Sequence, residues 1–398
     1  MTAATKQSKW LIPSMGMTQI IGWGSMFYAY GVLMQPMEAE LQTTRSVVVG
    51  AYSIALLLSG CLSTLSGAII DRIGGRLVMG GGALLAALMF FLMSYVDSVL
   101  TLYLVWAGLG VAMSATLYQP AFAVLTQVYG SGYRRAITAV TLFGGLSSSV
   151  FWPLTQALSD QVGWRDTWLI YAALNLLISF PVHALLPKFS PSTEAPTQAT
   201  QGKSGLAQVL RERSFYLLTT SFTLNALVFS AVSLHLMSLL QSRGITPTQA
   251  ATIGAMVGPM QVLGRILETT VGRNLSSHKI GLCAMWLLPL ALILLYAPNH
   301  WLWMYALFAG IYGISNGVMT IVRGTIPAEL YGREAYGAVS GAMGAPVMIA
   351  IAAGPFVASL LYTAIGSYMG MLLVLIAVGV LGSVMFNYAS PMDKHGHQ

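Results

Sequence analysis

The chain has 398 residues, of which 56% are hydrophobic and only 8% are charged, with a formal net charge of +7. A soluble domain carries about 25% charged residues, so this composition excludes an ordinary soluble protein and places much of the chain in lipid. Basic residues in the cytoplasmic loops of a membrane protein explain the net positive charge, so no nucleic-acid partner is expected. The two cysteines, Cys61 and Cys283, both fall within predicted membrane spans, so no disulfide framework is expected.

The apolar runs predict a chain that crosses the membrane many times. One transmembrane helix needs about 20 apolar residues, and about twelve such helices fit with short loops between them. The stretch Met1–Lys9 is short and polar, and the run after it is long enough to span, so no cleavable signal peptide is expected. The predicted spans are 11–36, 44–69, 77–96, 99–125, 136–158, 167–186, 214–240, 249–271, 280–297, 302–327, 337–363 and 366–388.

The basic residues predict the orientation of these spans. With both termini inside, 14 of the 19 lysines and arginines become cytoplasmic, and only Arg45, Arg165 and Arg243 lie in outer loops. An excess of basic residues on the cytoplasmic side is the usual determinant of topology. We therefore expect a multi-pass protein of the bacterial inner (plasma) membrane, with both termini cytoplasmic.

A change in composition divides the chain in two. Residues 190–201 are rich in Ser, Thr, Pro and Gln, which is typical of a linker. We expect a six-helix half over residues 1–186, a cytoplasmic linker over 187–213 and a second six-helix half over 214–398.

The two halves repeat weakly. Tyr129-Gly130 and Trp152-Pro153 recur about 202 residues later as Tyr331-Gly332 and Gly354-Pro355. Such duplication is how many carriers build a central site between two halves. The predicted fold is an all-α membrane protein with twelve transmembrane helices in two six-helix, pseudo-symmetric halves.

The turn between the second and third predicted spans reads Gly67-Ala-Ile-Ile-Asp71-Arg72-Ile-Gly74-Gly75-Arg76. Asp71 stands at a cytoplasmic helix end, where it can accept charge-assisted hydrogen bonds. Gly74 and Gly75 permit a tight turn, and Gly67 permits close approach of a neighbouring helix. An ordinary basic turn on the inner side is the alternative interpretation. The corresponding turn in the second half, residues 272–279, contains no aspartate.

This turn resembles the signature of the major facilitator superfamily, in which glycine, three residues, aspartate and a basic residue precede a glycine and a second basic residue. Gly163-Trp164-Arg165 and Arg134-Arg135 are further points of similarity. The resemblance implies alternating access between two halves, with the turn acting as an inner latch. It assigns the gating motif to Gly67, Asp71, Arg72, Gly74 and Arg76.

Two other places resemble the monocarboxylate porter and oxalate–formate antiporter branch of that superfamily. One is the first-span run from Gly22-Trp23-Gly24 to Gly31, and the other is Arg265 in the eighth span. The resemblance implies that Arg265 binds a substrate carboxylate. The chain departs from animal monocarboxylate porters at Gln261 and Val32, where those porters carry an aspartate and a lysine, and it lacks the span-eleven lysine of the oxalate carriers.

Arg265 also stands out on physical grounds, because a charge at membrane depth costs about 2.5–3.5 kcal/mol on insertion scales. Its planar guanidinium can hold a carboxylate through two parallel hydrogen bonds. Gln261 lies one turn earlier on the same helix face and can add a third. The alternative is an ion pair between Arg265 and Glu268, since residues three apart are neighbours on a helix.

Three more polar residues in the second half have open roles. Arg323, near the cytoplasmic end of span ten, can be a second anion contact, a snorkelling residue or a structural partner for Glu268 or Glu329, and the structural pair is favoured. Glu268 is either a proton carrier or one member of an ion pair. His235 in span seven is either a coupling residue or a hydrogen-bonded wall residue.

Aromatic residues mark the first half. Tyr28, Tyr118 and Phe143 lie in spans one, four and five, which the resemblance implies line the cavity. They can contact the organic body of a substrate or simply pack. Apart from Asp71, the first half has no charge within its spans, so we expect an aromatic wall on that side and a charged wall on the other.

The sequence therefore predicts a secondary active transporter for a small organic anion, with a monocarboxylate favoured, working as a proton symporter or an anion antiporter. An exporter of amphipathic compounds or drugs is the alternative within transport, and a transporter-like receptor or an integral membrane enzyme is the alternative outside it. No metal-ligand cluster or nucleophile–base arrangement is visible, so no enzyme activity, metal or cofactor is expected. The expected partners are the anion, a proton or counter-anion, and lipid, with the protein a monomer.

Overall fold

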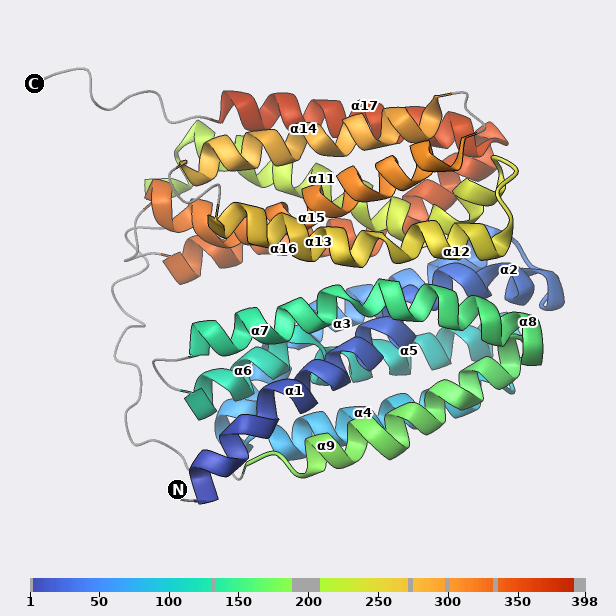
Figure 1. Ribbon diagram of the computed structural model, residues 1–398, viewed down its shortest axis with the longest axis vertical. Helices are drawn as coiled ribbons and strands as arrows, with labels where there is room; N and C mark the ends of the chain where they lie inside the picture. The colour runs from blue at the N-terminus through green and yellow to red at the C-terminus, as the bar shows by residue number, and fades with distance from the viewer. Residues whose placement is uncertain are drawn as a thin grey trace, which may run out of the picture. The chain divides into compact units, whose positions relative to one another are not determined.

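The computed structural model describes residues 3–129, 133–187, 208–270, 275–297, 301–331 and 336–389 (Figure 1). Every regular element in these ranges is a helix. The predicted linker core, residues 190–201, lies outside them. The helices are α1 (Ala3–Trp23), η1 (Gly24–Tyr28), α2 (Tyr30–Glu40), α3 (Arg45–Ile73), α4 (Gly75–Met93), α5 (Val99–Thr116), α6 (Tyr118–Tyr129), α7 (Tyr133–Gly145), α8 (Ser147–Leu174), η3 (Asn175–Ser179), α9 (Phe180–Ala184), α11 (Arg213–Gln241), α12 (Pro247–Ala255), α13 (Val257–Thr270), α14 (Ser277–Tyr296), α15 (Leu302–Tyr331), α16 (Tyr336–Ile365) and α17 (Tyr368–Tyr388).

The described helices confirm the predicted fold class. Ten runs among them are long and apolar enough to cross a membrane. One run, Arg135–Ala184, holds two crossings, because Gly163 with φ 80° and ψ 172° breaks the helical path inside α8. That break lies between the predicted spans 136–158 and 167–186. With α1, η1 and α2 forming the first crossing, the chain reaches twelve.

Residue contacts group the chain into two compact units. The first contains Met1–Thr193 and Ser233–Gly258, and the second contains Glu194–Val232 and Pro259–Gln398. The change between Thr193 and Glu194 falls within the predicted linker, whereas the grouping of Ser233–Gly258 with the first unit has no counterpart in the sequence pattern. The division into residues 1–186 and 214–398 stays a prediction.

An aromatic cluster holds the first unit together around Trp106 of α5. The ring centroid of Trp106 lies 4.4 Å from that of Tyr30, 5.1 Å from that of Tyr52 and 6.2 Å from that of Trp168. These edge-to-face contacts join α2, α3, α5 and α8, and each adds about 0.5–1.5 kcal/mol beyond the area it buries. The cluster fixes the rotation of helices that the candidate aromatic wall depends on.

The second unit packs through small residues and serine hydroxyls. Ser221 Oγ donates to Gly382 O at 2.7 Å, and Ser383 Oγ donates to Met285 O at 2.8 Å. A Cβ atom at Gly354 of α16 would lie 2.6 Å from Leu227 O of α11, so these two helices are in backbone contact. Close approach at glycine and serine is the usual way in which helices associate in lipid.

Candidate functional site

The predicted gating turn joins α3 to α4. The Gly74 amide donates to Ile70 O at 2.8 Å and ends α3, and the φ of 85° at Gly74 belongs to the region that favours glycine. A Cβ atom at Gly75 would lie 2.1 Å from Val124 Cγ2, so the close packing of α4 on α6 also requires glycine there. Both glycines of the turn thus have a structural reason.

The other members of the gating motif are placed less uniformly. Arg76 Nε donates to Leu186 O at 3.0 Å and ties the start of α4 to the end of α9, while Arg72 is exposed in the last turn of α3. A Cβ atom at Gly67 would meet no described atom within 4 Å, so the expected close approach of a helix there is not seen. The side chain of Asp71 lies outside the described residues.

The second motif, at Gly163, has a structural role at the opposite helix ends. Trp164 Nε1 donates to Glu40 Oε2 at 2.5 Å, and Arg165 Nε donates to Glu40 Oε1 at 2.9 Å. The Arg165 guanidinium also donates to Ser94 O at 2.6 Å and to Val96 O at 2.9 Å. These bonds join the end of α2, the end of α4 and the turn within α8.

The carboxyl group of Glu40 is affected by both neighbours. The indole N–H of Trp164 contributes most to holding the pKa of Glu40 below its ordinary value of 4.5, and Arg165 adds a hydrogen bond and its charge. Burial opposes this lowering of the pKa, by more than either contribution of Arg165 taken alone, but the pKa of Glu40 still stays below its ordinary value. Glu40 is therefore a carboxylate near neutral pH. We call the contacts of Arg165 with Glu40, Ser94 O and Val96 O, together with the Trp164–Glu40 hydrogen bond, the Arg165 lock.

Helix α13 carries three of the predicted site residues and crosses α15 in backbone contact. A Cβ atom at Gly264 would lie 2.6 Å from Ile314 O, and one at Gly317 would lie 2.1 Å from Gln261 O. This crossing leaves Gln261 only 3% exposed and Arg265 8% exposed. The sequence-predicted pair on one face of the helix is therefore buried inside the second unit.

Gln261 offers a donor next to Arg265. The amide nitrogen Nε2 of Gln261 is shielded from solvent and has no hydrogen-bond acceptor among the described residues. Arg265 lies four residues further along the same face. An amide N–H beside a guanidinium matches the acceptor-only character of a carboxylate.

The structure corrects the expected pairing of Glu268. Its carboxylate makes no hydrogen bond or ion pair with any residue that the structure describes. Glu268 is half-buried whereas Arg265 is buried, so spacing along the helix did not bring the two groups together.

The expected partners of Arg323 are also wrong. Its Nη2 donates to Asn225 Oδ1 of α11 at 2.7 Å. Glu329 Oε2 instead accepts from the Ser277 backbone N–H at 3.0 Å, at the start of α14. Free amide groups at a helix N-terminus attract a carboxylate, which explains the preference of Glu329. Asn225, 5% exposed, is a site residue that the sequence analysis missed.

The three predicted aromatic residues of the first unit fall into two places. The Tyr28 ring lies edge-on to Trp152 with centroids 5.0 Å apart. The Tyr118 ring lies 4.9 Å from that of Trp23, and a Cβ atom at Gly144 would touch the Tyr118 hydroxyl at 2.2 Å. Phe143, the neighbour of Gly144, packs on Gly16 of α1 and is 36% exposed. Tyr118 and Phe143 thus share the α1–α7 region.

Trp23 is a further polar group that the sequence analysis left unused. Its indole nitrogen is shielded from solvent and has no acceptor among the described residues. The run Gly22-Trp23-Gly24 was the available signal, because its glycines indicate close packing beside Trp23: a Cβ atom at Gly24 would overlap the Phe151 ring. Trp23 therefore joins Tyr118 as a candidate for the aromatic wall.

Two histidines are buried in the first unit. His235 of α11 is fully buried. His183 of α9 places Nδ1 3.2 Å from Met79 O and Nε2 3.1 Å from Thr18 Oγ1. Because a carbonyl only accepts, Nδ1 carries a proton that it donates to Met79 O, while Nε2 and the Thr18 hydroxyl share the second hydrogen bond. The sequence analysis missed His183, which joins α1, α4 and α9 as a structural group.

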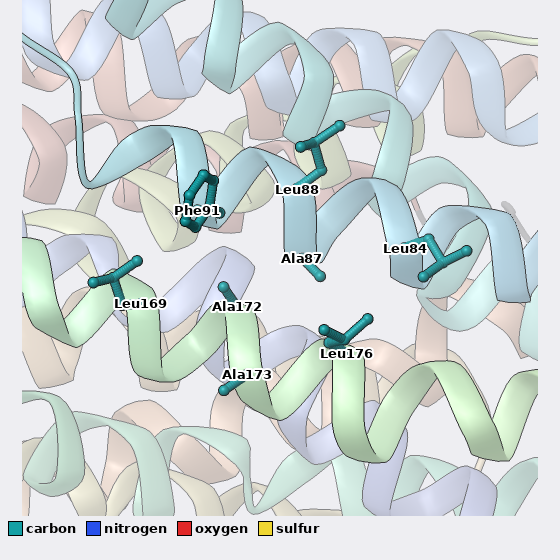
Figure 2. A pocket seen from close by; sticks show the side chains of 8 residues that line it. All are labelled: Leu84, Ala87, Leu88, Phe91, Leu169, Ala172, Ala173 and Leu176. Atoms are coloured by element: carbon teal, nitrogen blue, oxygen red, sulfur yellow. The ribbon is translucent and has the colours of Figure 1, made fainter.

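An apolar groove between α4 and the second arm of α8 is unsuited to an anion. Figure 2 shows its lining, and its volume is about 430 Å³. All of its lining side chains are apolar, so it offers no donor to a carboxylate. It is lined by Leu84, Ala87, Leu88, Phe91, Leu169, Ala172, Ala173 and Leu176. No cluster of three or more metal-binding side chains occurs among the described residues.

Comparison with solved structures identifies the fold. The nucleoside transporter NupG superposes with a TM-score of 0.81 at 15% identity, over 96% of this chain and 100% of that one. A bacterial homologue of the human lysosomal transporter Spinster, inward-facing and unoccupied, gives 0.74 at 13% identity, over 97% and 99%. At these identities the likeness concerns the fold alone.

Comparison with curated sequences identifies relatives. Monocarboxylate transporter 13 of Rattus norvegicus is 26% identical over 309 residues, which is 76% of this chain and 71% of the relative. An uncharacterized MFS-type transporter, YcxA, of Bacillus subtilis is 22% identical over 352 residues, or 84% and 83%. Residues 16–280 match the Major Facilitator Superfamily. The relatives are membrane transporters rather than enzymes, and this chain belongs to the Major Facilitator Superfamily.

Proposed function

We propose that this protein moves a small organic anion, with a monocarboxylate favoured, across the membrane by alternating access. The observation that carries the proposal is the buried donor pair on α13, the Arg265 guanidinium and the Gln261 amide nitrogen. The names of several relatives, which are monocarboxylate transporters, support the same substrate class.

The energetics make Arg265 the decisive residue. A carboxylate that enters a cavity of low dielectric constant loses its hydration, and a fixed guanidinium replaces it with two parallel charge-assisted hydrogen bonds. Removing one member of a buried, hydrogen-bonded charge pair costs about 2–5 kcal/mol. At about 1.4 kcal/mol for each factor of ten, that is roughly thirty-fold or more in affinity.

Uptake into liposomes tests the proposal. Wild-type protein is expected to accumulate a labelled monocarboxylate, Arg265→Ala to lose uptake and binding, and Arg265→Lys to recover only part, because an ammonium cannot reproduce the fork. Arg211→Ala removes a positive charge from an exposed position and is the matched control. Unchanged affinity in a well-folded Arg265→Ala protein would falsify the assignment of a carboxylate site to Arg265.

We infer that coupling is by proton symport or anion exchange, with Glu268 and His235 as the candidate groups. Glu268 is the stronger candidate, since its half-buried carboxylate has no ion-pair partner among the described residues. If Glu268 carries the proton, Glu268→Gln abolishes proton-driven uptake and leaves anion exchange intact. If this variant retains proton-driven uptake, Glu268 does not carry the proton, and His235→Gln is the next variant to test.

We further propose that the turn between α3 and α4 is an inner latch and that both termini are cytoplasmic, in a bacterial inner membrane. The turn geometry at Gly74 and the distribution of basic residues support this. Asp71→Asn is expected to fold and insert but to transport slowly, and normal transport would contradict the latch assignment.

Single cysteines placed in residues 187–205 should react with impermeant thiol reagents only from the cytoplasmic side. Labelling of intact cells from outside would contradict the proposed orientation.

A further inference from the structure

The guanidinium group of Arg323 in α15 has few hydrogen-bond acceptors around it. One nitrogen donates to Asn225 Oδ1 at 2.7 Å, and Nε is shielded from solvent without an acceptor among the described residues. A guanidinium has five N–H donors, so a single amide oxygen satisfies only a small part of its hydrogen-bonding capacity.

The charge of Arg323 is likewise not balanced by the protein that the structure describes. Glu329 is engaged at the Ser277 amide, and Glu268 makes no bond. The two ion pairs in the described ranges, Arg45–Glu38 and Arg165–Glu40, belong to the first unit. The Arg323 side chain is half-buried, with Nε shielded from solvent, and a charged side chain at membrane depth without a counter-charge is costly. Within a membrane span, such a residue points to a ligand of opposite charge.

The contacts between α13 and α15 limit how far Arg323 and Arg265 can differ in depth. Helices α13 and α15 are separated by the single crossing of α14, so they run in the same direction (Figure 1). They touch where Gly264 and Gly317 meet the opposite backbone. Counted from the contact of Gly264 with Ile314, Arg265 lies one residue further and Arg323 lies nine further. Counted from the contact of Gly317 with Gln261, they lie four and six residues further. The two arginines therefore differ by two to eight residues, or about 3–12 Å of helix rise.

We propose that Arg323, positioned by Asn225, is a second anion subsite, and that the substrates include dicarboxylates. This inference rests on the proposed function, in which Arg265 binds the first carboxylate. A monocarboxylate uses Arg265 and Gln261 and leaves Arg323 without a counter-charge. A second carboxylate on the same small molecule supplies that counter-charge, so a dicarboxylate is bound more tightly than a monocarboxylate of equal chain length.

Calorimetric titration of purified protein with succinate and butyrate tests the subsite, because both ligands have four carbons. Wild-type protein is expected to bind succinate more tightly. Arg323→Gln keeps a polar side chain but removes the charge, and it should weaken succinate about thirty-fold while changing butyrate by less than about threefold. Asn225→Ala should weaken succinate by a smaller factor, because Arg323 keeps its charge and loses only its anchor. Arg211→Gln is the control for loss of one exposed positive charge.

The outcomes separate this inference from the proposed function. Wild-type protein that binds butyrate as tightly as succinate overturns the subsite and leaves the monocarboxylate proposal standing. Wild-type protein that binds neither ligand, nor any other small carboxylate, overturns both. Equal losses for the two ligands in Arg323→Gln would make Arg323 part of a single carboxylate site and also overturn the inference. If Arg323→Gln does not fold, Arg323→Lys replaces it in the test. This variant keeps the positive charge and is expected to bind succinate more tightly than butyrate, and loss of that preference in a folded protein would contradict the subsite.

Discussion

The arginines compared between the two compact units differ in their place along the helices and in their partners. In the first unit, Arg45 and Arg165 lie at helix ends and form ion pairs with Glu38 and Glu40. In the second, Arg265 and Arg323 lie within membrane spans, and the acceptor that holds Arg323 is the neutral amide of Asn225. A charge at a helix end with a carboxylate partner supports the fold, whereas the half-buried guanidinium of Arg323, held by one neutral amide, keeps unused hydrogen-bonding capacity.

The interiors of the units differ in the same sense. Several polar groups inside the first unit are neutral and hydrogen-bonded to one another: Asn175 Nδ2 donates to Tyr171 O at 2.9 Å, one turn earlier in the same helical run, and the Thr155 and Tyr171 hydroxyls, on either side of the break in α8, lie 2.6 Å apart. Such groups satisfy one another and fix helix rotation. The charged wall expected for the second half and the aromatic wall expected for the first stay predictions.

The largest effect on this comparison is expected from the α13–α15 crossing. Gly317→Ala places a methyl group 2.1 Å from Gln261 O, so the helices must separate and carry Arg265 with them. We expect a loss of about 1–3 kcal/mol of stability, as for other overpacked positions, together with loss of carboxylate binding. Thermal unfolding and ligand titration measure both.

Gly324→Ala is the matched control on the same helix. A Cβ atom there meets no described atom within 4 Å. Alanine favours the helix by up to about 1 kcal/mol over glycine, so this variant should be as stable as wild type or slightly more stable. If Gly317→Ala and Gly324→Ala have the same melting temperature and affinity, the crossing does not position the site.

The sequence predicted the spans well because hydropathy reports directly on lipid. The break at Gly163 falls in the loop expected between spans five and six, and the turn at Gly74 falls where the glycine pair indicated. Both features are local, since glycine is the residue that adopts positive φ without strain. Local chemistry was sufficient for each of them.

The pairing of side chains could not be predicted in the same way, because hydropathy does not give the rotation of each helix about its axis. Arg323 meets Asn225, which is 98 residues away, and His183 meets Thr18, which is 165 residues away. The spacing of three residues on one helix predicted Glu268 as a partner for Arg265, but no ion pair between them is found among the described residues. Contacts between distant spans decided each case.

A second, smaller effect is expected at the lock formed by Arg165. Arg165→Ala removes hydrogen bonds to Glu40, Ser94 O and Val96 O. Partial exposure screens these bonds, so we expect a loss of about 1–2 kcal/mol rather than the sum of three charge-assisted bonds. Arg45→Ala breaks the pair with Glu38 and should cost about 0–1 kcal/mol. Both variants should bind carboxylates like wild type. Equal melting temperatures for the two would show that the backbone contacts of Arg165 add nothing.

The smallest effect is expected from the protonation of Glu40. Its pKa is lower in the folded protein than the ordinary 4.5, chiefly through Trp164 and then through Arg165. Stability from this group is therefore present above the unfolded pKa and is lost as the pH falls through the folded value. The melting temperature of wild type should fall more steeply below about pH 4.5 than that of Glu40→Gln. Trp164→Phe removes the N–H but keeps a ring beneath the Arg165 guanidinium, which lies 4.3 Å above the indole, and should give an intermediate slope. Parallel acid profiles for all three proteins would mean that the carboxylate form of Glu40 contributes nothing to the lock.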